Sequence, residues 1–253
     1  MMPPVSRSTL VGFLDRTLQT AKYEDQSLNG LQVEGAGIVR KAAFAVDASL
    51  ETFEAAADSG ADFLMVHHGL FWGLPYPITS HRYRAIRTLI ESGISLYASH
   101  LPLDVHKRYG NNAGLAKIVG ATNLRLFGAY HNASWGYAGT VKPTPLARIV
   151  SRFEKTLGCK AVLHAFGKKT IQRIGFVSGG GSFAVEEAAE RELDLLVSGE
   201  PSHSRFHLAQ ELGINALFLG HYATETLGVK AMREVIKRRF GIKTVFLDIP
   251  TGL

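Results

Sequence analysis

The chain has 253 residues, of which 46% are hydrophobic and 20% are charged. These proportions are typical of a soluble globular protein with a sizeable core, and they exclude a largely disordered chain. The net charge of +6 and the pI of about 9.4 favour anionic partners such as nucleotides or nucleic acid, or simply provide a well-hydrated surface. The tight basic clusters at 168–169 and 237–239 are not interleaved with aromatic residues. A nucleic-acid partner is therefore unsupported by any motif.

The longest apolar runs, such as residues 61–66 and 216–219, are too short to cross a bilayer. The first ten residues lack the apolar stretch of a signal peptide. Cys159 is the single cysteine, which excludes a disulfide within the chain and a zinc site built from thiolates. We expect Cys159 to be a small buried hydrophobic residue. Together these features predict a protein of the reducing cytoplasm with no membrane partner.

Hydrophobic periodicity, turn residues and helix caps predict an alternation of helices and strands. The expected helices cover residues 8–20, 49–59, 82–92, 111–118, 145–157, 183–192, 205–212 and 224–239. The expected strands cover residues 41–46, 62–66, 95–98, 161–165, 174–177, 193–197, 216–219 and 244–248, with hairpin strands between 122 and 142. This alternation indicates an α/β architecture.

Two segments, one in each half of the chain, also share the same order of predicted elements. Residues 45–68 and 176–200 both run from a strand through an acidic helix to an Asp-led strand with a polar tip. If this repeat in sequence reflects a repeat in structure, the chain holds two similar α/β lobes, with His68 and Glu200 at equivalent strand ends.

Polar residues of the kind that bind metals come directly after the predicted buried strands. In open α/β sheets, ligands bind outside the carboxyl ends of the strands, so these side chains are expected to converge. They are His67, His68, His100, Asp104, Glu200 and His221.

Each of these signals has a simpler alternative when it is taken alone. The His67-His68 pair could be an ordinary surface pair, although Gly69 loosens the backbone enough for both rings to face one site. His221 and Glu225 are spaced i and i+4, which places them on one helix face, where they bind a metal or form a capping turn. Asp104 could cap a helix or a turn.

Taken together, these are three imidazoles and two carboxylates without cysteine, a set that suits zinc, iron, manganese or nickel. They are His67, His68, His221, Asp104 and Glu225. Five ligands exceed the needs of one structural zinc. The pattern therefore favours a centre of two divalent metal ions with open positions for water.

Several motifs occur in an order that resembles the YbgI-like family of GTP cyclohydrolase I type 2 homologues. They are Ser-Leu-Asn-Gly-Leu-Gln-Val at 27–33, Val-His-His-Gly at 66–69, Ser-His-Leu-Pro-Leu-Asp at 99–104, Gly-Asn-Asn at 110–112, Ser-Gly-Glu at 198–200 and Gly-His-Tyr-Ala-Thr-Glu at 220–225. The resemblance runs from about residue 25 to residue 233.

The resemblance implies a dimetal centre at five positions that all match the family pattern: His67, His68, Asp104, His221 and Glu225. It also implies two intertwined α/β lobes with duplicated topology and mixed sheets, with the metal site in the cleft between them. We expect one lobe over 1–125 plus 219–253, carrying most of the metal ligands, and a second lobe over 126–218. Members of the family assemble as toroidal homohexamers, so the same assembly is expected.

The resulting hypothesis is a hydrolase that uses two zinc, iron or manganese ions and acts on a nucleotide or another cyclic amide-type small molecule. For a GTP-type substrate, water attacks the imidazole ring carbon of guanine and opens the ring. His100 and Glu200 are the candidates for general acid–base work or for orientation of the ligands, and His203 could also reach the site. The alternative for all three is hydrogen bonding within the fold.

Two glycine-containing segments have open roles. Residues 27–32 either hold substrate or form a turn, and the glycines at 179–181 either cradle phosphate or make a tight turn. The alternative function is a metal-containing toroidal ring that binds nucleic acid or protein and has no cyclohydrolase activity.

Overall fold

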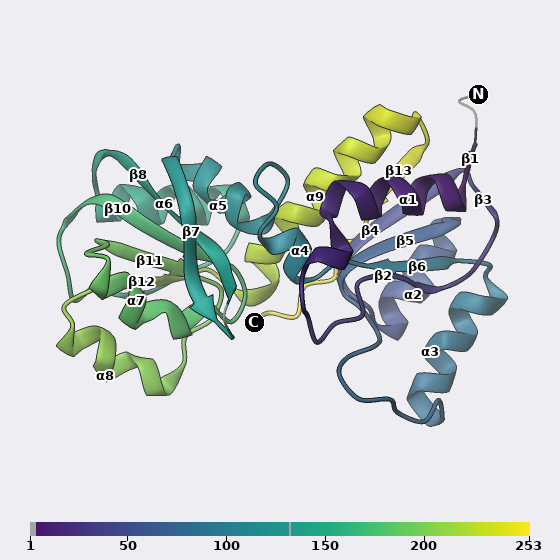
Figure 1. Ribbon diagram of the computed structural model, residues 1–253, viewed down its shortest axis with the longest axis horizontal. Helices are drawn as coiled ribbons and strands as arrows, with labels where there is room; N and C mark the ends of the chain where they lie inside the picture. Colours follow the sequence, from purple (N-terminus) through teal and green to yellow (C-terminus); the bar gives the residue numbers. More distant parts are fainter. Residues whose placement is uncertain (1–3, 132) are drawn as a thin grey trace. The chain divides into compact units, whose positions relative to one another are not determined.

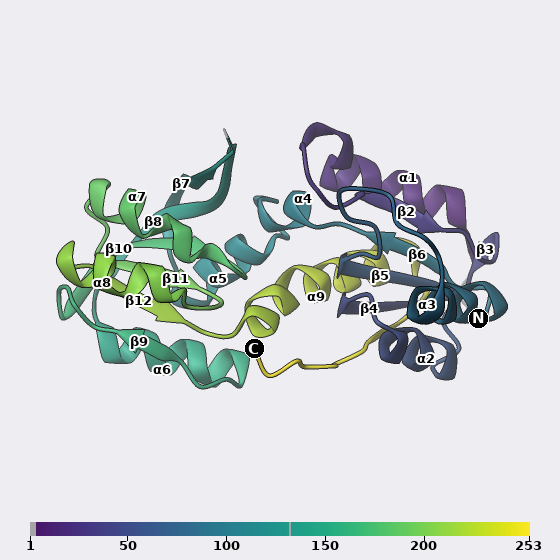
Figure 2. The same cartoon turned by 90° about the horizontal axis from the view of Figure 1, so that it is seen from below.

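The computed structural model describes residues 4–131 and 133–253, which form two compact units. The first unit comprises residues 1–103 and 228–249, and the second comprises 104–227 and 250–253, apart from the few residues outside the described ranges. Both units combine helices with one large mixed sheet, which confirms a mixed α/β protein with two mixed sheets (Figures 1 and 2).

The sheet of the first unit has the strand order β13-β4-β5-β6-β2. Four of its strands run parallel, and β2 is antiparallel to β6. Its strands are β2 (Gly30–Val33), β4 (Lys41–Asp47), β5 (Phe63–His68), β6 (Ser95–Ala98) and β13 (Lys243–Phe246), and a separate pair joins β1 (Val5–Ser6) to β3 (Ile38–Val39).

Helices cover both faces of this sheet (Figures 1 and 2). Helix α1 (Arg7–Leu18) and the later turns of α9 (His221–Phe240) lie on one face, where Phe13 and Phe240 meet edge to face. Helices α2 (Leu50–Asp58) and α3 (Ser80–Glu91) lie on the other. Coverage on both sides explains why β5 is buried along all but its last residue and begins with four apolar side chains.

The sheet of the second unit has the strand order β7-β8-β10-β11-β12-β9. Strands β10, β11 and β12 are parallel, and the other pairings are antiparallel. The strands are β7 (Thr122–Tyr130), β8 (Ala133–Pro145), β9 (Val162–His164), β10 (Thr170–Val177), β11 (Leu195–Ser198) and β12 (Asn215–Phe218).

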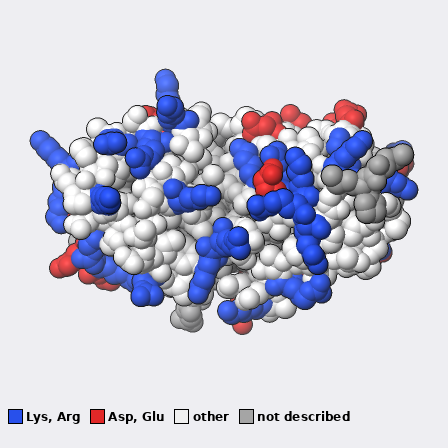
Figure 3. All heavy atoms as spheres, turned by 90° about the horizontal axis from the view of Figure 1, so that it is seen from above, with Lys and Arg blue, Asp and Glu red and all other residues white. Residues whose placement is uncertain are grey.

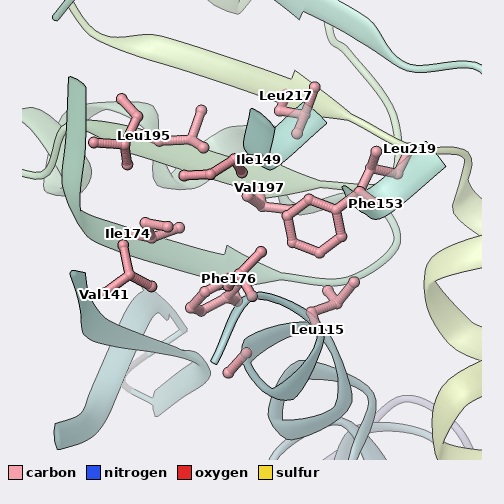
Figure 4. Close-up of a cluster of buried hydrophobic side chains, with 13 residues drawn as sticks. Leu115, Val141, Ile149, Phe153, Ile174, Phe176, Leu195, Val197, Leu217 and Leu219 are labelled. Carbon is pink, nitrogen blue, oxygen red and sulfur yellow. The ribbon is translucent and has the colours of Figure 1, made fainter. Parts of the chain in front are cut away.

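Alternate residues of β11 fill cores on opposite faces of this sheet. Leu195 and Val197 join a cluster with Phe153 and Leu115, which come from α6 (Leu146–Leu157) and α5 (Asn111–Val119) (Figure 4). Leu196 packs on the other side, against α7 (Val185–Glu190) and α8 (His203–Glu211). Cys159 is half-buried at the rim of the first cluster rather than fully buried.

Local sequence signals account for several helix boundaries. The Ser49 hydroxyl caps α2 by accepting the N–H of Thr52 at 3.1 Å. Gly120 and Gly158 adopt the left-handed conformation that ends α5 and α6. All the predicted helices and strands occur, with ends displaced by a few residues.

Some short elements were not predicted. They are β1, β2, β3, α4 (Leu101–Asp104), and the 3-10 helices η1 (Thr20–Lys22) and η2 (Gly181–Ala184). Helix α9 begins at His221, three residues earlier than expected. Within the described residues, no helix has the length and apolar character needed to span a membrane.

Candidate metal centre

Three imidazoles converge at the carboxyl edge of the sheet in the first unit. His67 and His68 end β5, and His100 follows the neighbouring parallel strand β6. The ring centre of His67 lies 4.6 Å from that of His68 and 5.1 Å from that of His100. One ring nitrogen from each residue lies within 4.8 Å of the others, close enough for the three to share a metal ion. His100 was predicted as a proton carrier or orienting residue, and its position also permits a ligand role.

Each of the three imidazoles faces an oxygen acceptor through its Nδ1 atom. Nδ1 of His67 lies 2.9 Å from the Ser99 carbonyl oxygen, and Nδ1 of His68 lies 2.7 Å from Asp47 Oδ1. Nδ1 of His100 lies 3.0 Å from Asp25 Oδ1. These acceptors favour the tautomer with hydrogen on Nδ1, which leaves the lone pair of Nε2 for a metal or a proton.

Asp25 organises the segment that holds His100. Its carboxylate accepts the N–H of Ser27 at 3.1 Å and the amide of Asn29 at 2.9 Å, and Asn29 in turn accepts the His100 N–H at 2.7 Å. Burial raises the pKa of Asp25, but the hydrogen bonds from His100, Asn29 and Ser27 outweigh it, so the pKa is lowered overall. Ser27 and Asn29 thus belong to an irregular segment that positions His100, while residues 30–32 belong to strand β2 rather than to a turn.

In the second unit, His221 lies between two carboxylates. His221 and Glu225 occupy the first turns of α9, and Nε2 of His221 lies 3.3 Å from Glu225 Oε1. Nδ1 of His221 lies 3.3 Å from Glu200 Oε2. The hydrogen bond with Glu225 raises the pKa of His221 to about 9, against the opposing effect of burial and with help from the charge of Glu200.

Gly179 lets the backbone approach this pair. Its φ is +59°, and a Cβ there would overlap Glu225 Oε1 and lie 2.9 Å from His221 Nε2. Its N–H donates to Thr224 Oγ1 at 3.0 Å, while the Gly181 N–H donates to the Gly179 carbonyl at 2.9 Å. Because these two N–H groups are used within the protein, the structure favours a tight turn over a phosphate cradle.

Asp104 is a buried carboxylate at the end of α4. Its Oδ1 accepts the Asn111 side-chain amide at 2.8 Å and the Ser178 hydroxyl at 2.9 Å. Two donors on one oxygen fix the orientation of the carboxylate, as is usual for carboxylates that bind metals.

The structure thus groups the predicted residues in sets. His67, His68 and His100 meet in the first unit, and Glu200, His221 and Glu225 meet in the second. His203 is exposed at the start of α8. Nitrogen and oxygen donors without sulfur fit zinc, iron or manganese.

Sequence reasoning missed four residues that hold these side chains in place. They are Asp25, Asp47, Asn111 and Ser178. Asp47 and Ser178 carried a usable signal, because each lies at the end of a buried strand, as the histidines do. Asp25 lies in an irregular segment and carried none.

The chain matches known proteins over nearly its whole length. The model of the Duf34/NIF3 (NGG1p interacting factor 3) family matches residues 5–252. The GTP cyclohydrolase 1 type 2 homolog of Deinococcus radiodurans is 45% identical over 250 residues, which cover 98% of this chain and 95% of the relative.

Two solved structures show the same similarity. The crystal structure of TTHA1606 from Thermus thermophilus has a TM-score of 0.91 at 41% identity. The structure of protein ybgI has a TM-score of 0.92 at 33% identity. Each comparison covers 98% of this chain and 100% of the other.

Proposed function

Because the chain belongs to the Duf34/NIF3 (NGG1p interacting factor 3) family, we propose that it is a metal-dependent hydrolase that binds two divalent metal ions. Its substrate is a nucleotide or another small molecule with a cyclic amide-type ring, as the relatives' name, GTP cyclohydrolase 1 type 2 homolog, suggests. The observation that carries the proposal is the set of three imidazoles whose Nδ1 atoms all face oxygen acceptors. Such anchoring is typical of histidines that bind metals through Nε2.

The residues that would hold zinc, iron or manganese are His67, His68, Asp104, His221 and Glu225. When bound, the cations act as Lewis acids that polarise the substrate and lower the pKa of water. The donor set is anionic through Asp104 and Glu225, both of which are buried. Carboxylate oxygens beside imidazole nitrogens form a donor set that suits divalent zinc, iron or manganese.

His100 is suited to carry the proton in this reaction. Its Nε2 takes a proton from the attacking water, while Asp25 stabilises the imidazolium through Nδ1. The new bond joins the water oxygen to the ring carbon, and the C–N bond of the ring breaks. His100 then gives its proton to the departing nitrogen. Glu200 orients His221 through the contact with Nδ1.

The fold and assembly implied by the family belong to the same proposal. The run β4-α2-β5 in the first unit and the run β10-α7-β11 in the second both pair two parallel strands across a helix. This repetition supports two lobes of duplicated topology. A homohexamer is expected, and analytical ultracentrifugation of the purified chain would test it.

The metal content is the first measurement. We expect about two metal ions per wild-type chain by inductively coupled plasma mass spectrometry when the protein is purified without chelators. The variants His68→Ala and Glu225→Ala should lose metal and turnover while keeping the circular dichroism spectrum of the wild type. His207→Ala and Glu211→Ala, on the exposed side of α8, are matched controls that should keep both.

Two outcomes would contradict the proposal. A wild-type chain that takes up no zinc, iron or manganese after reconstitution has no metal centre. A loaded chain that hydrolyses none of a panel of nucleotides and cyclic amides is not the proposed hydrolase.

The net charge of +6 supports the alternative of a metal-containing ring that binds nucleic acid or protein. Lys and Arg side chains are spread over the face drawn in Figure 3, with uncharged surface between them. This alternative predicts binding to polynucleotides that weakens steeply with salt. Weak binding to both single and double strands at low salt would exclude the nucleic-acid form of it.

A further inference from the structure

The first unit contains a cavity of about 430 Å3, and one of its lining residues, Trp72, contacts the rings of His68 and His100. Its walls come from the start of α2, the segment after β5 and the start of α3, through residues that include Ser49, Trp72, Tyr76, His81 and Arg82. The volume falls in the range of roughly 300–1,000 Å3 that is usual for sites that bind small molecules.

Two aromatic rings form fixed walls of this cavity. The Trp72 indole N–H donates to the Gly69 carbonyl oxygen at 2.7 Å, and the Tyr76 hydroxyl donates to the Leu70 carbonyl oxygen. The Trp72 side chain is nevertheless 36% exposed. Because the polar ends of both rings are bonded to the backbone, the rings are held in place, and the exposed Trp72 ring can stack on a planar ligand. The Tyr76 ring is itself stacked on Phe71, with ring centres 5.8 Å apart.

A cation lies against the same walls. The Arg82 guanidinium carbon sits 4.0 Å from the centre of the Tyr76 ring, and within residues 4–131 and 133–253 no carboxylate forms an ion pair with Arg82. His81 lines the cavity next to it. A guanidinium binds phosphate through two parallel hydrogen bonds, so the cavity offers an anion site next to a stacking surface.

Trp72 lines the cavity and also contacts two of the three imidazoles. Its ring centre lies 4.9 Å from that of His100 and 5.9 Å from that of His68. Trp72 therefore links the cavity to the two histidines, and Arg82 lines the same cavity.

We propose that this cavity binds a planar heterocycle that carries a phosphate group, with the ring against Trp72 and the phosphate at Arg82, which Tyr76 holds in place. That this ligand is also the substrate rests on the proposed function. The binding itself requires only residues of the first unit.

Isothermal titration calorimetry with GMP and with guanosine tests the proposal. The protein is first freed of metal with EDTA. Arg82→Gln should weaken GMP binding about ten- to hundredfold and leave guanosine unchanged, because the charged hydrogen bonds to phosphate are lost. Trp72→Leu should weaken both ligands. Arg84→Gln, exposed on the same helix, is the matched control and should bind GMP as the wild type does.

Trp72 can also report its own occupancy. The chain has two tryptophans, so Trp135→Phe leaves Trp72 as the single indole, and GMP should quench its fluorescence. The proposal is overturned if wild-type protein binds no GMP, if Arg82→Gln binds it unchanged, or if calorimetric binding leaves the Trp72 signal unaltered.

These results separate the two proposals. GMP binding in a chain that loads no metal would reject the hydrolase and keep the cavity's role. Normal metal loading and turnover, together with an Arg82→Gln variant that binds GMP like the wild type, would keep the hydrolase and reject the cavity's role.

Discussion

His68 Nδ1 lies 2.7 Å from Asp47 Oδ1, and the two residues face each other across the parallel pairing of β4 and β5. The strand register itself therefore sets this contact. The carboxylate fixes the orientation of the imidazole ring, as partners behind metal-binding histidines usually do.

Removal of this carboxylate should weaken metal binding. For Asp47→Ala we expect a loss of about 10- to 100-fold in zinc affinity, the usual effect of losing a partner behind a ligating histidine. Competition with a chromophoric chelator measures it. Asp58→Ala, at the exposed end of α2, should retain wild-type affinity, and equal affinities in the two variants would show that Asp47 does not support His68.

Gly179→Ala should disrupt the His221–Glu225 pair. The new methyl group would overlap Glu225 Oε1, and the left-handed backbone adds roughly 1–2 kcal/mol of strain. We expect lower metal content and a lower Tm, measured by mass spectrometry and calorimetry.

Gly180→Ala is the matched control for that substitution. Its φ is −76°, and its Cβ would meet Glu200 Oε1 at 3.6 Å, an ordinary contact. Metal content that falls equally in both variants would point to a general loss of the turn rather than to the clash with Glu225.

Asp194 should make the stability of the chain depend on pH in acid. Burial raises its pKa, but hydrogen bonds from Lys168 Nζ and from the N–H groups of Arg173 and Gln172 outweigh it, so the folded-state pKa is below 3.8. Ionised Asp194 thus stabilises the folded chain above about pH 3.8. This stabilisation is lost as the pH falls through the lowered pKa of the folded state.

Asp194→Asn measures this contribution. At pH 7 the variant should be less stable by about 1–3 kcal/mol in urea denaturation, the usual worth of hydrogen bonds to a charged group. The difference from wild type should shrink below pH 3.8. A difference that stays constant from pH 7 to pH 2.5 would contradict the assignment.

Phe153 should be a main support of the core drawn in Figure 4. It is fully buried among Leu115, Ile149 and Val197, so Phe153→Ala should destabilise the protein by about 3–5 kcal/mol. Leu126→Ala, on the exposed side of β7, should change stability by less than about 0.5 kcal/mol. Chemical denaturation of the two variants compares them directly, and equal losses would show that Phe153 is not a core residue.

The amino-acid sequence by itself determined the α/β alternation, and it also predicted histidines and carboxylates that the structure brings together. Apolar periodicity and caps such as Ser49 act over a few residues, so they can be recognised without knowledge of the fold. The His221–Glu225 spacing is of the same kind, because one helical turn brings positions i and i+4 together.

Only the tertiary structure decided which groups hold those residues in place. His100 is bonded to Asp25 from 75 positions away, and His68 to Asp47 from 21 positions away. The fit of Gly179 against Glu225 depends in the same way on where β10 ends beside α9. Such contacts follow from which strands become neighbours and in what register. That choice depends on burial of the whole sheet between its helices, so no local pattern in the chain encodes it.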